Sequence, residues 1–168
     1  VRAHITLRQK EMNMKHIFLD FDGVVSPFVK VNEDVIPCVS DSGFDISYLE
    51  YVIEWINDKV ADPEWNVYWL TTWVDRIREL DKTGVSSEIE IIHRTKDDIL
   101  INHGHLWKPE AGIEKYHEII NEHPDDMIIW IDDDSRIVNH PSLTNIVSFS
   151  PNKYIGLTRE ELDTIDRL

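Results

Sequence analysis

Short apolar segments alternate along the chain with segments in which apolar residues recur at helical spacing. The first kind predicts buried strands, which we place at 16–19, 66–70, 88–93, 127–131 and 145–149. The second kind predicts helices, which we place at 46–60, 74–82, 110–122 and 158–168. Three helix ends carry local signals, namely Asp45 as an N-cap, Gly84 as a C-terminal stop, and a Thr158-x-x-Glu161 capping box.

Strands that alternate with helices predict an α/β fold. We expect a three-layer arrangement, with a central, mainly parallel sheet of about five strands and helices on both faces. Residues 14–168 would form a single domain, in which glycines and prolines make residues 24–44 a short flap. Residues 1–13 precede Met14 and lack an apolar core, so we interpret them either as a native N-terminal segment or as a disordered or artificial extension.

Polar residues follow three of the predicted strands at the point where each strand ends. Asp20 and Asp22 follow the first strand, Thr71 and Thr72 follow the second, and the acidic run 132–134 follows the fourth. Parallel sheets bind ligands beyond the carboxyl ends of their strands. The pattern therefore predicts a functional site at this edge of the sheet, built mainly from carboxylates.

The same residues resemble four motifs of the haloacid dehalogenase (HAD) superfamily. Residues 17–25, which read IFLDFDGVV, resemble its DxDG(V/T) signature, and residues 69–72, which read WLTT, resemble its second motif. Lys108 within Trp-Lys-Pro resembles the third motif, and residues 128–133, which read IIWIDD, resemble the fourth. All four occur in the superfamily's order. The resemblance implies a three-layer Rossmannoid, HAD-like fold and a phosphatase of the small, capless type found in bacteria and phages.

The resemblance also implies a role for each motif residue. Asp20 is the nucleophile, whose carboxylate attacks phosphorus and forms an aspartyl-phosphate. Asp22 is the general acid that protonates the leaving oxygen and the general base that then activates water. Thr71 donates a hydrogen bond to a phosphoryl oxygen, and Lys108 places a positive charge beside the phosphoryl group.

Mg²⁺ is the cofactor that the resemblance implies, and hard oxygen ligands of the kind this ion prefers are present. The ligands would be Asp20, Asp132 and the backbone carbonyl of Asp22, while Asp133 would either coordinate the ion or hold a water bound to it. The residues themselves also favour a cation, because the acids at 132–134 would repel one another strongly without one.

Alternatives stay open at several positions. Thr71 and Thr72 are also typical of strand-end or helix-capping residues. Three other lysines compete for the role of Lys108, namely Lys82, Lys96 and Lys115. The helix predicted to follow Pro109 and the distance to the fourth motif favour Lys108.

Two further features have no single interpretation. Trp73 and Trp107 each lie beside a proposed site residue, where an indole either stacks on a base of the substrate or forms a wall of the site. His103 and His105 are a weak signal for zinc, because no cysteine lies nearby, and we interpret them as part of a loop.

The charge of the chain restricts its partners. The 32 acidic residues outnumber the 17 basic ones, for a net charge of −15. Such a surface argues against nonspecific nucleic-acid binding and against anionic membranes, and a phosphorylated substrate would need a metal ion or a local cation. Cys38 is the only cysteine, so no intrachain disulfide can form, and we expect a cytoplasmic location.

The spacing of the motifs bears on the substrate. Neither the segment between Asp22 and Thr71 nor the segment between Thr71 and Lys108 is long enough for a full cap domain. We therefore expect a Mg²⁺-dependent phosphomonoester hydrolase with an open site, acting on a nucleotide, another small phosphomonoester, or a nucleic-acid or protein phosphate. The alternatives are a phosphotransferase and a non-catalytic HAD-like module that binds a metal or a partner.

Overall fold

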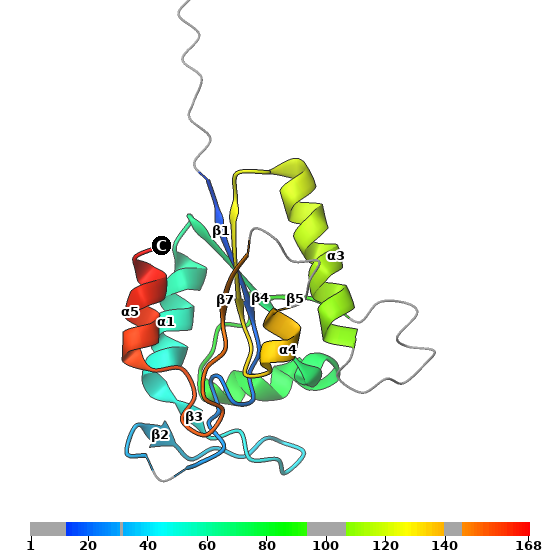
Figure 1. The fold of residues 1–168 in the computed structure, drawn as a ribbon. Coiled ribbons are helices and arrows are strands. Elements are labelled where there is room, and N and C mark those ends of the chain that lie inside the picture. The colour runs from blue at the N-terminus through cyan, green and yellow to red at the C-terminus, as the bar shows by residue number, and fades with distance from the viewer. Residues whose placement is uncertain (1–12, 31, 94–106, 140–145) are drawn as a thin grey trace, which may run out of the picture.

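The structure, a computed structural model, describes residues 13–30, 32–93, 107–139 and 146–168. Five parallel strands form one sheet in the order β5-β4-β1-β6-β7. Their bounds are β1 Lys15–Leu19, β4 Trp65–Trp69, β5 Glu90–Ile91, β6 Met127–Ile131 and β7 Ile146–Phe149. The parallel sheet with helices around it confirms the predicted α/β, Rossmannoid fold (Figure 1).

Helices pack against both faces of the sheet. The helical segments are α1 Glu50–Ala61, the 3₁₀ helix η1 Thr72–Thr83, α3 Trp107–Glu122, α4 Ser135–Val138 and α5 Arg159–Asp166. Figure 1 shows α1 and α5 together on one side and α3 and α4 on the other. Among the described residues, no helix has the length and apolar character needed to cross a membrane.

The alternation of side chains along β1 divides the interior into two cores. Ile17 and Leu19 join the core under α1 and α5, whereas Phe18 joins the core under α3. This division follows from the period of two in a strand, which sends successive side chains to opposite faces. The central strands are apolar on both faces for this reason.

The central strands end level with one another, and this brings the predicted site residues together. Leu19 pairs with Trp69 of β4 and with Ile131 of β6. Immediately after these pairs, the backbone N–H of Asp20 donates to the carbonyl of Ile131 at 3.0 Å. Asp20 and Asp132 directly after their strands, and Thr71 two residues after β4, therefore reach the same edge of the sheet, as the sequence pattern predicted.

Most boundaries lie within two residues of the prediction, and two helix starts differ by more. The first helix begins at Glu50 rather than at residue 46, because Tyr48–Leu49 forms strand β3, which pairs antiparallel with β2 Val35–Ile36. Asp45 does not cap the helix; its side chain accepts from the N–H of Ser47 and closes a turn. The helix predicted from residue 110 instead begins at Trp107 as α3.

The described residues of the segment 24–44, which include β2, lie at the carboxyl end of the sheet (Figure 1). Its role as a flap and the lack of a full cap domain stay predictions. Residues 1–12 of the predicted extension lie outside the described residues, as do Lys96, His103 and His105.

Candidate active site

Lys108 joins two buried carboxylates at the carboxyl edge of the sheet. Its Nζ lies 3.1 Å from Oδ2 of Asp20 and 2.6 Å from Oδ2 of Asp132. All three side chains are almost fully buried, with exposed fractions of 3%, 7% and 1%. Backbone N–H groups hold the carboxylates from the other side, since Phe21 donates to Asp20 at 2.8 Å and Asp134 donates to Asp132 at 2.9 Å.

The position of Lys108 depends on how closely α3 approaches the sheet. Gly112 lies one turn after Lys108, and a Cβ atom built there would lie 2.1 Å from the indole of Trp130 on β6. Only glycine permits this approach. Burial lowers the pKa of Lys108, but the negative charges of Asp20 and Asp132 outweigh this effect, so that the pKa is raised overall.

The rival lysines within the described residues lie elsewhere. Lys82 pairs with Asp41, and Lys115 pairs with Glu90 and Glu118. Of the candidates in the described part of the chain, Lys108 is the one that contacts the motif carboxylates.

Three carboxylates form a group that fits a divalent cation. Asp20, Asp132 and Asp133 each offer an oxygen within 4.8 Å of the others. Burial and the charge of Asp20 raise the pKa of Asp132 to about 7, and the same causes raise the pKa of Asp133. The buried Oδ2 of Asp132 has its ion pair with Lys108 but no well-directed hydrogen bond from a described residue. The three carboxylates thus supply hard oxygen ligands that can still bind a cation, as Mg²⁺ requires.

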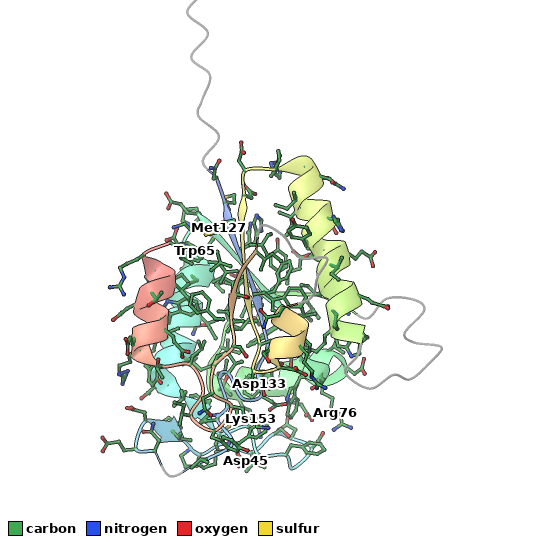
Figure 2. All side chains as sticks on the ribbon, in the orientation of Figure 1. Asp45, Trp65, Arg76, Met127, Asp133 and Lys153 are labelled. Carbon is green, nitrogen blue, oxygen red and sulfur yellow. The ribbon has the colours of Figure 1, made fainter. Side chains whose placement is uncertain are left out.

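Gly23 allows Asp133 to reach this group. Its φ is 74°, a left-handed conformation that glycine adopts without strain. A Cβ atom at this position would lie 2.7 Å from Cγ of Asp133. The glycine of the first motif therefore serves both the turn after Asp22 and the packing of a carboxylate from the fourth motif. Figure 2 shows Asp133 at the end of the sheet opposite Trp65 and Met127, the first residues of β4 and β6.

Asp22 is held by a tryptophan. Nε1 of Trp73 donates to Oδ2 of Asp22 at 2.9 Å. Burial and the neighbouring charge of Asp20 raise the pKa of Asp22, and the hydrogen bond from Trp73 partly offsets this. We did not predict this contact from the sequence, and the only signal for it was the position of Trp73 just after the second motif.

Trp107 has a different place. It is 1% exposed and packs in the core with Phe18 and Trp130. A side chain this deeply buried is not accessible for stacking on a substrate base, whereas Trp73 contacts Asp22.

Thr71 is buried at the end of β4 and acts as a helix cap. Its Oγ1 accepts from the N–H of Trp73 at 3.4 Å, which makes Thr71 the N-cap of η1. A hydroxyl that accepts one hydrogen bond can still donate another. The capping interpretation is therefore observed, and the contact between Thr71 and a phosphoryl oxygen stays a prediction.

A family model described as "HAD domain in Swiss Army Knife RNA repair proteins" matches residues 16–162, which is most of the chain. Neither a curated protein nor a solved structure is significantly similar to the chain. The matched range contains all the residues of the site described above: Asp20, Asp22, Gly23, Thr71, Trp73, Lys108, Asp132 and Asp133.

Proposed function

The chain belongs to the family of HAD domains in Swiss Army Knife RNA repair proteins, and from this premise we propose that it is a Mg²⁺-dependent phosphomonoester hydrolase that uses Asp20 as its nucleophile. One observation carries the proposal, namely the buried contact of Lys108 with both Asp20 and Asp132. A cation that lies between two carboxylates at a strand edge positions a nucleophile and counters the charge of an arriving phosphate.

The first step transfers the phosphoryl group to the protein. An oxygen of the Asp20 carboxylate forms a bond to phosphorus, and the bond between phosphorus and the leaving oxygen breaks. Asp22 donates its proton to that leaving oxygen. The raised pKa of Asp22, caused by burial and by Asp20, favours the protonated form that this step needs. Lys108 balances negative charge on the phosphoryl oxygens.

The second step releases phosphate and restores the protein. Asp22, now a carboxylate, takes a proton from a water molecule, whose oxygen attacks phosphorus. The bond between phosphorus and Asp20 breaks, so that inorganic phosphate leaves. The hydrogen bond from Trp73 to Asp22 keeps the carboxyl group in one place for both proton transfers.

Mg²⁺, when bound, would neutralise the charge that otherwise keeps a phosphate dianion away from a carboxylate. Asp20, Asp132 and Asp133 are the side chains that would hold it. The ligand role of the Asp22 carbonyl stays an inference from the resemblance.

We infer the substrate class from the family description and from the predicted lack of a full cap domain. The family occurs in RNA repair proteins, so we propose a phosphate at the end of a polynucleotide as the substrate. The net charge of −15 argues against tight binding of the polynucleotide backbone. Recognition would then be confined to the few groups next to the scissile phosphate.

A phosphate-release panel with Mg²⁺ tests the proposal. It would contain sugar phosphates, nucleotides, phosphopeptides, and oligonucleotides with 3′- or 5′-phosphates. We expect release from at least the oligonucleotides, and loss of release in Asp20→Asn with an unchanged circular dichroism spectrum. Full activity of Asp20→Asn would exclude Asp20 as the nucleophile. A phosphorylated product formed with an added alcohol or nucleoside would instead indicate a phosphotransferase.

A further inference from the structure

An open pocket of about 390 Å³ is lined in part by Asp22, and none of the three grouped carboxylates, Asp20, Asp132 and Asp133, lines it. Its lining residues come from the segment before β3 and from the start of η1: Asp22, Phe44, Thr72, Trp73, Asp75 and Arg76. Its volume lies within the range of small-molecule sites. If Asp22 protonates the leaving oxygen, as the proposed function states, then the group attached to that oxygen must lie beside Asp22. The pocket is therefore on the leaving-group side of the site.

The walls of the pocket are suited to a flat ring. Phe44 is 49% exposed, so part of its ring is accessible to a ligand. Its ring lies 6.0 Å from that of Trp73 at 89°, and the guanidinium of Arg76 lies 5.1 Å from the centre of the Phe44 ring. Exposed aromatic faces and guanidinium planes are the surfaces on which nucleobases stack. Figure 2 shows Arg76 toward the same end of the molecule as Asp133.

The charges of the pocket favour an uncharged ring over a second phosphate. The charge of the one guanidinium, that of Arg76, is balanced by the carboxylate of Asp75, and Asp22 is the protonated acid of the proposed first step. The lining therefore has no net positive charge for a second phosphate. Carboxylates accept hydrogen bonds from the amino and imino groups of bases, whereas they repel phosphate. The pocket therefore combines a stacking surface with acceptors.

We propose that this pocket binds the nucleobase of the nucleoside that carries the scissile phosphate, with the base stacked on Phe44 beside Arg76. The inference rests on the proposed function and adds a specificity site to it. It also reconciles a polynucleotide substrate with an acidic chain, because a stacked base contributes affinity without a basic surface along the strand.

The test compares two short single-stranded oligonucleotides, whose terminal phosphate is carried either by an ordinary nucleoside or by an abasic residue. We expect kcat/KM to be roughly 10-fold to 100-fold higher for the first, since stacking of one base has about this effect. Phe44→Ala should remove most of this preference, and Phe44→Trp should retain it. Phe28→Ala is the matched control, because Phe28 is also half exposed and has Lys153 over its ring but does not line the pocket.

The outcomes separate the inference from the proposed function. Equal kcat/KM for the two substrates, or an equal loss of preference in Phe28→Ala and Phe44→Ala, would overturn the inference and leave the hydrolase proposal standing. If no phosphomonoester is hydrolysed, the proposed function is wrong. The inference about the pocket is then tested by calorimetry of nucleoside monophosphate binding. Binding that Phe44→Ala weakens supports the pocket, and binding that Phe44→Ala leaves unchanged overturns it.

Discussion

Nζ of Lys108 lies 2.6 Å from Oδ2 of Asp132, and both side chains are almost fully buried. The contact joins the first turn of α3 to the residue that follows β6. Breaking a buried ion pair from one side leaves an uncompensated charge in a medium that solvates it poorly. This contact therefore makes the stability of the domain depend on the same residues that we propose for catalysis.

Replacement of Lys108 tests both roles. We expect Lys108→Met to lower phosphate release by at least about 100-fold and to lower the free energy of unfolding without Mg²⁺ by about 3–5 kcal/mol. Mg²⁺ should recover much of the stability but not the activity. Urea unfolding with and without the ion measures this.

Lys115→Met is the matched control on the same helix. Lys115 pairs with two exposed glutamates, Glu90 and Glu118, so its loss should cost at most about 1 kcal/mol. If the two variants lose equal stability, the buried ion pair of Lys108 stabilises the domain no more than the exposed ion pairs of Lys115 do.

Removal of one carboxylate tests the metal group. Mg²⁺ at 100 times its Kd adds about 2.7 kcal/mol, which corresponds to a rise of about 5–10 °C in Tm for a domain of this size. We expect this rise in the wild type and its loss in Asp132→Asn or on addition of EDTA.

Asp134→Asn is the control for that experiment. Asp134 accepts from the N–H of Arg136 as the N-cap of α4, and it does not belong to the carboxylate group. Asparagine caps a helix about as well as aspartate. The Mg²⁺-dependent rise in Tm should therefore persist, and its loss in Asp134→Asn would contradict the assignment of the group.

Gly23→Ala tests the contact with Asp133. The variant should lose about 1–3 kcal/mol because alanine is strained at positive φ, and it should also lose most of the Mg²⁺-dependent rise in Tm. Gly84→Ala has a similar φ of 81° with nothing within 4 Å of the added Cβ atom. Gly84→Ala should therefore lose stability but keep the Mg²⁺-dependent rise in Tm. A full response to Mg²⁺ in Gly23→Ala would mean that Asp133 does not hold the ion.

Trp73→Phe tests the hydrogen bond to Asp22. The variant keeps an aromatic ring but lacks the N–H donor. Hydrogen bonds to charged groups contribute about 1.5–3 kcal/mol, so kcat should fall by about 10-fold to 100-fold while KM changes less than about 3-fold. Steady-state kinetics on an oligonucleotide phosphate measures the two constants.

Trp55→Phe removes an equivalent donor far from the site. Nε1 of Trp55 donates to Oδ1 of Asp166 at 2.8 Å, which joins α1 to α5. This variant should lose stability and keep kcat. A comparable fall in kcat in both variants would show that the effect of Trp73→Phe is structural rather than one of positioning Asp22.

The sequence alone was sufficient to predict the sheet and the edge at which the site lies. The residues of β6 are apolar throughout and the acids follow at once, so the pattern defines both the strand and its end. The same holds for Asp20 after β1. Such predictions succeed because the apolar run that forms a buried strand and the polar residues that end it both lie within a short window of sequence.

The boundaries that failed depended on distant partners. Asp45 is a good capping residue in isolation, yet pairing of Tyr48–Leu49 with Val35–Ile36 delays the start of α1. The gain from pairing two segments outweighs a local preference that is worth about 1 kcal/mol. The residues around Asp45 alone do not show whether strand pairing or helix capping is favoured, because the pairing partner lies elsewhere in the sequence.

The contacts that distinguish the site were decided only by the tertiary structure. Trp73 donates to Asp22 across 51 positions of sequence, and Lys108 meets carboxylates from two different motifs. Gly112 permits the close approach of α3 because it lacks a side chain where Trp130 packs, and Gly23 likewise permits the approach of Asp133. The sequence by itself determined which chemical groups the domain has and at which edge they gather. Packing of α3 and η1 against the strand ends determined which groups touch, because close contact depends on the shapes of residues far apart in the chain.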